Sequence, residues 1–265
     1  RDHSQLRQKN LKDGDPMTVV LYGIDDDAQR HQENLGQRSD SIVLMSINPK
    51  DNKTVMVSVP RDTKTEIVGH NSTEKLNHAY AYGGPKMAVN SLEKLMDVPV
   101  DHYIAINMDG VKTVVDEIGG VNIISDATFK FHNYQFEKGK KYHMDGDQAL
   151  TYMRSRKEEG AGGDGGRQLR QQQVITAVAK EAFSMNSVTK LNSIFKAAQD
   201  NLRTDLSFIE LNKFRSDYSK ADNNVERLII DGQDDKGDDG LYYFYPNKDS
   251  LNEVKQKIKD NLEIK

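Results

Sequence analysis

Short apolar segments rich in β-branched residues alternate along this chain with longer segments of helical periodicity. Strands are expected at Met17–Gly23, Ser41–Asn48 and Thr54–Pro60, where polar turns bound residues of the buried type. The most regular helix is expected at Arg167–Ser184, and a terminal helix at Asn247–Leu262. This alternation predicts an α/β fold, a three-layer α/β/α domain around a central mixed β-sheet.

Weaker signals place the other elements. Helices are expected at Glu74–Tyr82, Pro85–Met96, Asp109–Ile118, Asp145–Met153, Ser187–Asp200 and Ser207–Lys220. Strands are expected at His102–Asn107, Val121–Ile124, Val225–Ile230 and Leu241–Tyr245. Residues 125–141 are expected to form a loop or a small hairpin, and residues 158–166 and 231–240 to form loops.

The length of 265 residues suits one large domain or two small ones. Because no internal repeat or proline-rich linker divides the chain, we expect one domain over residues 17–265, preceded by a solvated tail over residues 1–16. The chain begins at Arg1 rather than at a methionine, so we expect it to be part of a longer protein.

Composition excludes several classes of function. Charged residues make up 29% and hydrophobic residues 36%, a soluble globular balance without the roughly 18–20 apolar residues of a membrane span. The net charge of −4 argues against nucleic acid as a partner, since proteins that bind phosphate backbones are usually basic. The absence of cysteine excludes disulfides, thiolate nucleophiles and Cys-ligated zinc.

Acidic residues follow the first expected strand and precede the second. Asp25, Asp26 and Asp27 come directly after one strand, and Asp40 lies just before the next. Carboxylates at the ends of strands are suitable ligands for a hard divalent cation. An exposed acidic turn would have the same sequence pattern. Arg38 lies two residues before Asp40, on the same side of an extended chain. This pair is either part of such a site or an ordinary surface pair.

Arginines are concentrated near these same elements. Arg61 follows the strand-ending Pro60 and is either a phosphate ligand or a plain loop cation. Arg154 and Arg156 have a spacing of two, so both guanidinium groups can be directed at one anion. Six of the 12 arginines lie in the elements singled out here, whereas lysines are spread along the chain.

The start of the most regular helix combines polar and apolar residues on one face. The face begins with Arg167, Arg170 and Gln171, beside Asp164 in the preceding glycine-rich loop. Further along, the same face carries Val174, Ile175, Val178 and Ala182. A solvated face would not continue as an apolar one, so the polar residues are expected at the rim of a cleft, at a helix N-terminus that favours anions. Several arginines with two aspartates predict a pyrophosphate site with Mg²⁺, Mn²⁺ being a second candidate.

Other catalytic motifs are absent or weak. The loop GAGGDGG lacks the Gly-Lys-Ser/Thr ending of a P-loop, and neither GxSxG nor HExxH occurs. His78 is expected to be a packed or hydrogen-bonded helix residue rather than a metal ligand. The run Tyr242–Tyr245 is expected to form a strand rather than a sugar-stacking platform.

Eight strings occur in one order between Leu21 and Ile175. They are LYGIDDD, RSDSIVL, SVPRDT, KLNHAYAYGG, DHYIAINMDG, VVDEIGGVNI, MDGDQALTYMRSR and GDGGRQLRQQQVI. Together they resemble the LytR–CpsA–Psr family, the cell-wall glycopolymer ligases of Gram-positive bacteria. The segment between Asp25 and Arg38 departs from the family, because it is longer and richer in His and Gln than the usual short turn.

The resemblance implies a membrane-anchored phosphotransferase with its catalytic domain outside the cell. Such proteins have a single N-terminal transmembrane anchor, so residues 1–16 would be a juxtamembrane tail or linker. They transfer a glycopolymer, here most simply wall teichoic acid, from an undecaprenyl-pyrophosphate carrier to the 6-hydroxyl of N-acetylmuramic acid in peptidoglycan. Their metal-site aspartates match Asp25 and Asp40. Their pyrophosphate residues match Arg38, Arg61, Arg154, Arg156 and Arg167, with Asp164 and Gln171 beside them.

The chemistry of the residues agrees with this resemblance. Cleavage of a phosphoanhydride needs charge neutralisation at the transferred phosphoryl group, which Mg²⁺ and arginines provide without a protein nucleophile. Either Asp25 or Asp40 could accept the proton of the incoming hydroxyl. Two alternatives are a non-catalytic polyprenyl-pyrophosphate-binding or regulatory module, and a prenyl-pyrophosphate hydrolase.

The polyprenyl chain requires an apolar groove, because its burial contributes about 25 cal/mol per Å². The apolar part of the Arg167–Ser184 helix is expected to line this groove, facing the helices Pro85–Met96 and Asp109–Ile118. The predicted lipid-binding residues are Val89, Leu92, Val111, Val115, Val174, Ile175 and Val178. The alternative is that these side chains fill an ordinary core.

Overall fold

The computed structural model describes residues 4, 6–7, 10–25, 38–184, 188–221 and 224–265. The chain divides into two compact units, unit 1 (Arg1–Ala105 with Thr204–Lys265) and unit 2 (Ile106–Arg203). Each unit is described by itself. The expectation of one catalytic domain over residues 17–265 stays a prediction.

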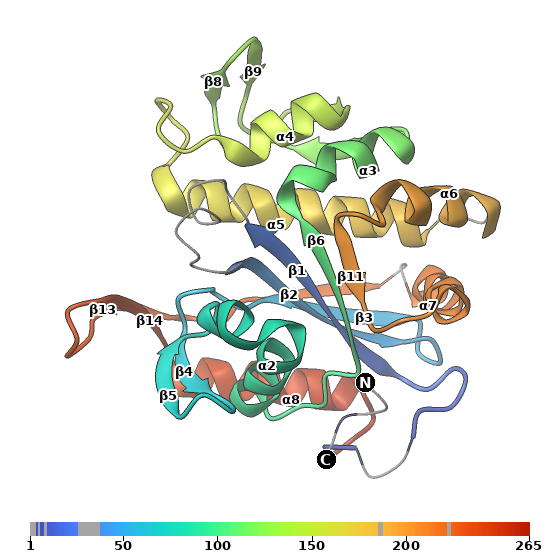
Figure 1. Ribbon diagram of the computed structural model, residues 1–265, viewed down its shortest axis with the longest axis vertical. Helices are drawn as coiled ribbons and strands as arrows, with labels where there is room; N and C mark the ends of the chain where they lie inside the picture. The colour runs from blue at the N-terminus through green and yellow to red at the C-terminus, as the bar shows by residue number, and fades with distance from the viewer. Residues whose placement is uncertain (1–3, 5, 8–9, 26–37, 185–187, 222–223) are drawn as a thin grey trace. The chain divides into compact units, whose positions relative to one another are not determined.

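A six-stranded mixed sheet forms the centre of the fold (Figure 1). Its strand order is β11-β6-β1-β2-β3-β12. The strands are β1 (Met17–Asp25), β2 (Arg38–Asn48), β3 (Lys53–Ser58), β6 (His102–Asn107), β11 (Leu202–Thr204) and β12 (Val225–Leu228). β2 pairs antiparallel with both β1 and β3, whereas β12 pairs parallel with β3. The predicted central mixed sheet is therefore confirmed.

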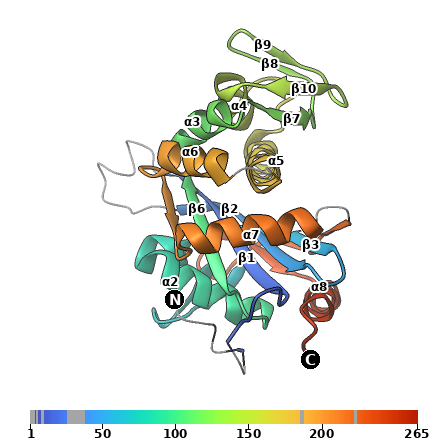
Figure 2. The ribbon, with the colours of Figure 1, turned by 90° about the vertical axis from the view of Figure 1, so that its right-hand side faces the viewer.

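Helices cover both faces of this sheet, as predicted for a three-layer α/β/α arrangement. On one face, α2 (His78–Met96) and α8 (Lys248–Asn261) contribute to an apolar core with Val20, Tyr22 and Leu44. On the other face, α7 (Phe208–Ala221) contacts β2 and β3 and lies across the strands (Figure 2). β1 and β2 are buried along almost their whole length, which is why their sequences read as continuous apolar runs.

Two hairpins extend unit 1 beyond the sheet. β4 (Lys64–Ile67) pairs with β5 (Ser72–Lys75), and β13 (Gly232–Lys236) pairs with β14 (Tyr242–Pro246). The predictions were wrong at two points here. Residues 231–240, expected to form a loop, contain a strand. The helix expected from Glu74 begins at His78, because Glu74 pairs with Thr65 in the hairpin.

The kink in α2 explains why the sequence reads as two helices. Gly84 has φ 65° and ψ −157°, outside the helical region and favourable only for glycine, and Pro85 follows it. The helix continues to Met96 after this break.

Unit 2 is mostly helical. Its elements are η1 (Met108–Gly110), α3 (Val111–Glu117), β7 (Val121–Ile124), β8 (Phe129–Phe131), β9 (Tyr134–Phe136), β10 (Lys141–Met144), α4 (Gly146–Arg154), α5 (Gly163–Phe183) and α6 (Val188–Ala198). β8 and β9 confirm the small hairpin allowed for residues 125–141. α5 begins at Gly163 rather than Arg167, so part of the expected glycine-rich loop is the first turn of the helix.

The N-terminal residues are packed more closely than the solvated tail that we expected. Ser4 is fully buried, and the Arg7 guanidinium pairs with the Asp101 carboxylate at 2.6 Å. Asp101 also accepts a hydrogen bond from the Thr18 amide at 2.8 Å, which ties this segment to the start of β1. Within the described part of the chain, no helix has the length and apolarity to cross a bilayer.

Candidate functional site

The register of β1 and β2 slips where the acidic residues were expected. Gly23 pairs with Ser41 and Ile24 with Ser39, so Asp40 is the extra residue of a β-bulge. Bulges of this kind bend the strand and redirect side chains, and they are over-represented next to active sites. Beyond the bulge, Asp25 and Arg38 lie directly opposite one another at the end of the ladder. The structure thus brings Asp25, Arg38 and Asp40 to one edge of the sheet.

Arg61 joins this edge from the end of β3. Its Nη1 atom lies 2.8 Å from Oδ1 of Asp40, and the two side chains are only 13% and 2% exposed. The Arg61 carbonyl accepts a hydrogen bond from the Asn77 amide at 3.1 Å, just before α2. Removing one partner of a buried ion pair usually costs about 3–5 kcal/mol, so Arg61 and Asp40 hold each other in place. Arg61 is therefore more than a plain loop cation.

Three uncharged polar side chains, two on β2 and one just before α2, are buried near this edge. Ser39, Ser41 and Asn77 are 1%, 0% and 2% exposed. Among the described residues, their Oγ and Oδ1 atoms have no hydrogen-bond partner. A buried polar atom left unsatisfied costs roughly 1–3 kcal/mol. Three such atoms occur beside the Asp40–Arg61 pair, as expected for a site where a bound polar ligand supplies the missing hydrogen bonds.

The carboxylates fit Mg²⁺ in type and number. Among the described residues, no group of three His, Asp or Glu side chains forms a complete metal cage. Mg²⁺ rarely needs one, since it is usually bound by one or two carboxylates together with waters and substrate phosphates. Asp25 and Asp40 supply two carboxylates on neighbouring strands. Asp26 and Asp27 lie outside the described residues.

A hydrogen-bonded group around Glu74 lies in the same unit. Its carboxylate accepts bonds from Ser72 Oγ at 2.6 Å and the Tyr82 hydroxyl at 2.5 Å, and His78 Nδ1 lies at 3.0 Å. Partial burial raises the pKa of Glu74, but these hydrogen bonds outweigh it and the net pKa is lowered. The bond to Glu74 raises the pKa of Tyr82 to about 12, while the charge of Arg38 lowers it, so Arg38 acts on this group. The expectation that His78 is hydrogen-bonded is confirmed.

This group was hardly predictable from the sequence. Its residues are spread over β5 and the first part of α2, and the hairpin that carries Glu74 was not expected. The only signal was the string KLNHAYAYGG, in which His78, Tyr80 and Tyr82 recur at even spacing.

In unit 2, the predicted residues at the start of α5 lie together. Arg167 Nη2 is 2.6 Å from Asp164 Oδ1, and Gln168 donates to Asp164 Oδ2 at 2.9 Å. Gln171 is 6% exposed, and its Oε1 atom has no hydrogen-bond partner among the described residues. The helix N-terminus favours an anion at this position. Gly166 is required nearby, because an added Cβ would lie 2.0 Å from the Ala161 carbonyl oxygen.

Arg170 has a different environment from the one expected. It is fully buried, and its Nη2 donates to the carbonyl oxygens of Ser155 at 2.9 Å and Ala161 at 2.7 Å. Its Nη1 lies 3.3 Å from Asp126, and its guanidinium lies over the Phe129 ring at 4.7 Å. These contacts hold the loop between α4 and α5 in place. In the structure Arg170 is bound within the fold rather than at the rim of a cleft.

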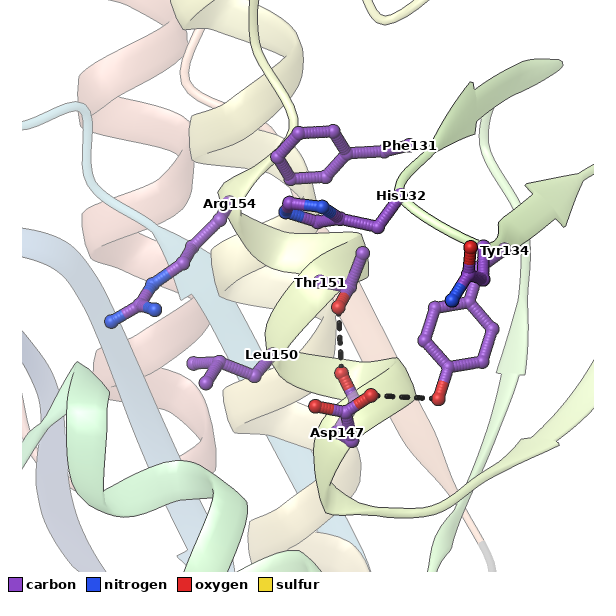
Figure 3. Close-up of a pocket in the computed structure, with 8 residues that line it drawn as sticks. Phe131, His132, Tyr134, Asp147, Leu150, Thr151 and Arg154 are labelled. Atoms are coloured by element: carbon purple, nitrogen blue, oxygen red, sulfur yellow. Dashed lines mark hydrogen bonds between the residues drawn. The ribbon is translucent and has the colours of Figure 1, made fainter.

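Arg154 and Arg156 lie on and just after the end of α4. Arg154 is its last residue, is half exposed and pairs with Asp109. It also lines a pocket with residues of the β8–β9 hairpin (Figure 3). The Arg156 amide donates to Glu158 at 2.7 Å.

All seven predicted lipid-binding residues are buried. Val89 and Leu92 belong to the core of unit 1. The other five, Val111, Val115, Val174, Ile175 and Val178, are 9% exposed or less and lie in unit 2. Burial suits both an ordinary core and a groove, so contact with a prenyl chain stays a prediction.

Comparisons with known proteins cover nearly the whole chain and agree with the resemblance found in its sequence. The model of the LytR_cpsA_psr family matches residues 1–260. A relative from Halalkalibacterium halodurans, named polyisoprenyl-teichoic acid–peptidoglycan teichoic acid transferase TagU, is 38% identical over 94% of this chain and 80% of its own length. A relative of the same name from Enterococcus faecalis is 38% identical over 100% of this chain and 86% of its own.

Solved structures agree with the sequence relatives. The crystal structure of Bacillus subtilis TagU is 35% identical and has a TM-score of 0.74, with 95% of this chain and 98% of that chain covered. A structure of TagT bound to LIIa-WTA is 31% identical and has a TM-score of 0.78, with 99% and 97% covered. On the match of the family model and of these relatives across nearly its full length, the chain belongs to the LytR–CpsA–Psr family.

Proposed function

We propose that this protein transfers teichoic acid from a polyisoprenyl-pyrophosphate carrier to peptidoglycan. The names of its relatives, the TagU transferases, support the reaction class. The structure of TagT bound to LIIa-WTA supports a lipid-linked glycopolymer as donor. The proposed carrier is undecaprenyl pyrophosphate, and the proposed acceptor is the 6-hydroxyl of N-acetylmuramic acid.

The proposal rests on the group of charged and polar residues at one edge of the unit 1 sheet. There the bulge at Asp40 gathers two carboxylates and two arginines, next to buried polar atoms that have no partner in the described structure. Transfer of a phosphoryl group depends mainly on positioning and charge neutralisation, which such a set provides. Within the described part of this set, the Oγ atoms of Ser39 and Ser41 have no base as a hydrogen-bond partner, which favours direct attack by the acceptor over a covalent enzyme intermediate.

In the proposed reaction, the acceptor hydroxyl attacks the phosphorus that carries the polymer. A new phosphodiester bond forms, the anhydride bond breaks, and prenyl phosphate leaves with the electron pair. Arg38 and Arg61 would neutralise the phosphate oxygens, and Asp25 or Asp40 would accept the hydroxyl proton. Mg²⁺ held by Asp25 and Asp40, or Mn²⁺ in its place, would supply further neutralisation of the pyrophosphate charge.

The residues of unit 2 receive separate roles. We retain Arg154, Arg156, Arg167, Asp164 and Gln171 as proposed pyrophosphate-binding residues. Arg170 is assigned a positioning role instead, because its Nη1 and Nη2 atoms are engaged by Ser155, Ala161 and Asp126. As for localisation, the teichoic acid chemistry of the relatives supports an extracytoplasmic catalytic domain, and a single-pass anchor is part of the same proposal.

A transfer assay tests the function. Purified protein is incubated with lipid-linked teichoic acid, with and without peptidoglycan oligomers. Polymer joined to the oligomer is the expected result, whereas release of prenyl phosphate alone would indicate a hydrolase, and no turnover would indicate a binding or regulatory module. Arg61→Ala should abolish transfer, and Arg227→Ala, which removes an exposed arginine of the same unit, should not.

A further inference from the structure

Unit 2 has a pocket of which the proposed chemistry uses one lining residue, Arg154. Its volume is about 490 Å³, which is within the ~300–1,000 Å³ of typical ligand sites. It lies between the β8–β9 hairpin and α4 (Figure 3). The lining residues are Phe131, His132, Asn133, Tyr134, Asp147, Leu150, Thr151 and Arg154.

The hairpin side of the pocket is aromatic. Phe131 pairs with Tyr134 across the hairpin, and the Phe131 and His132 rings lie 4.2 Å apart. His132 occupies the two-residue turn with φ 52°, in the left-handed region that favours glycine. Glycine would relieve this strain, yet the chain has here an aromatic ring that lines the pocket. Strain retained in this way points to a function for the side chain.

The α4 side is polar, but its charges are already balanced. The Tyr134 hydroxyl donates to Asp147 Oδ2 at 2.8 Å, and Lys112 Nζ lies 3.9 Å from Asp147 Oδ1. Arg154 pairs with Asp109. Arg154 is the one cation among the lining residues, so the rest of the pocket, around Asp147 and the hairpin, has little attraction for a phosphate. It suits a neutral ligand that offers hydroxyl and amide groups to Asp147, Thr151 and Asn133.

We propose that this pocket binds a neutral N-acetylhexosamine unit of the acceptor glycan strand. A sugar ring of this kind has an apolar face for His132 and Tyr134 and a polar edge for Asp147. The inference rests on the proposed function only in naming peptidoglycan as the source of the glycan. It adds a location in unit 2 that shares Arg154 with the residues assigned to the pyrophosphate.

The test measures sugar binding without any donor. The probes are tetra-N-acetylchitotetraose, the N-acetylglucosamine–N-acetylmuramic acid disaccharide with its lactyl carboxyl amidated so that it is neutral, and a polyol phosphate oligomer that represents teichoic acid. Isothermal titration calorimetry with wild-type protein should show saturable binding of the first two probes only. His132→Gly, which removes the ring while relieving the turn, should weaken this binding about tenfold without lowering the melting temperature. Tyr242→Ala, which removes a tyrosine that is 65% exposed in unit 1, is the matched control and should bind normally.

Three results would overturn the inference. They are no saturable binding of either sugar probe, unchanged binding by His132→Gly, and binding of the polyol phosphate that His132→Gly abolishes. Binding of the lipid-linked donor is measured in parallel with the same variant, without acceptor, and should be unchanged. Failure of the wild type to join teichoic acid to peptidoglycan oligomers would instead count against the proposed function and leave the sugar result to be judged alone.

Discussion

The Asp40–Arg61 pair offers a quantitative test of how the sheet edge is built. The Asp40 side chain is 2% exposed and the Arg61 side chain 13%, with 2.8 Å between the charged atoms. Arg61→Met leaves a buried carboxylate without its counterion and should destabilise the protein by about 3–5 kcal/mol. That is a large part of the ~5–15 kcal/mol that stabilises a typical domain. Asp40→Asn should cost less, about 1–3 kcal/mol, since the arginine is more exposed and can turn toward water.

Urea unfolding of the two single variants and the double variant completes the cycle. The double variant should be more stable than the sum of the single effects predicts, with a coupling energy of about 2 kcal/mol or more. Arg227→Met, at an exposed position in the same sheet, should change stability by no more than about 0.5 kcal/mol. A loss below about 1 kcal/mol in Arg61→Met would refute the claim that this pair is held by burial.

Four further predictions concern the site. Asp25→Ala and Asp40→Ala should each abolish Mg²⁺-dependent turnover, and full activity of either at saturating Mg²⁺ would remove the metal assignment. Arg154→Lys should lower kcat/KM nearly as much as Arg154→Ala, roughly 10²–10³-fold, because lysine lacks the planar guanidinium; near-normal rates would show that only charge matters. The pKa of folded Glu74 is lowered from its usual 4.5, so its contribution to stability is present above that value and lost as pH falls below it. Between about pH 6 and pH 3, the free energy of unfolding measured in urea should therefore fall less for Glu74→Gln than for the wild type. An equal fall in both proteins would contradict the assignment. Donor affinity should fall with each isoprene unit removed while its salt dependence stays constant, and indifference to chain length would exclude the apolar groove.

The fold was predictable where burial dominates the sequence. β1 and β2 are almost wholly buried, so their apolar runs identify them without further knowledge. Elements that depend on tertiary contacts were not predictable in this way. β13 is exposed along its whole length and has an acidic sequence, and it is a strand because it pairs with β14. The first turn of α5 is rich in glycine, which by itself disfavours a helix.

The site was predictable in its residue types but less so in its geometry. Residue types and spacing pointed to Asp25, Arg38, Asp40 and Arg61, and the structure places them at one edge of the sheet. The bulge at Asp40 was not foreseeable, because a register shift depends on the partner strand as well as on the strand itself. For Arg170, periodicity gave the correct face of the helix but not the carbonyl oxygens of the α4–α5 loop that surround its guanidinium.

The central claim is that a hydroxyl of peptidoglycan, rather than water, attacks the donor. The most direct measurement is the reaction of lipid-linked teichoic acid with peptidoglycan oligomers in ¹⁸O-water, followed by mass spectrometry of both products. Transfer to the sugar predicts that the polymer–peptidoglycan phosphodiester and the released prenyl phosphate contain no ¹⁸O. One ¹⁸O atom in the polymer phosphate or the prenyl phosphate, at the same rate with and without the oligomer, would show hydrolysis and contradict the proposed function.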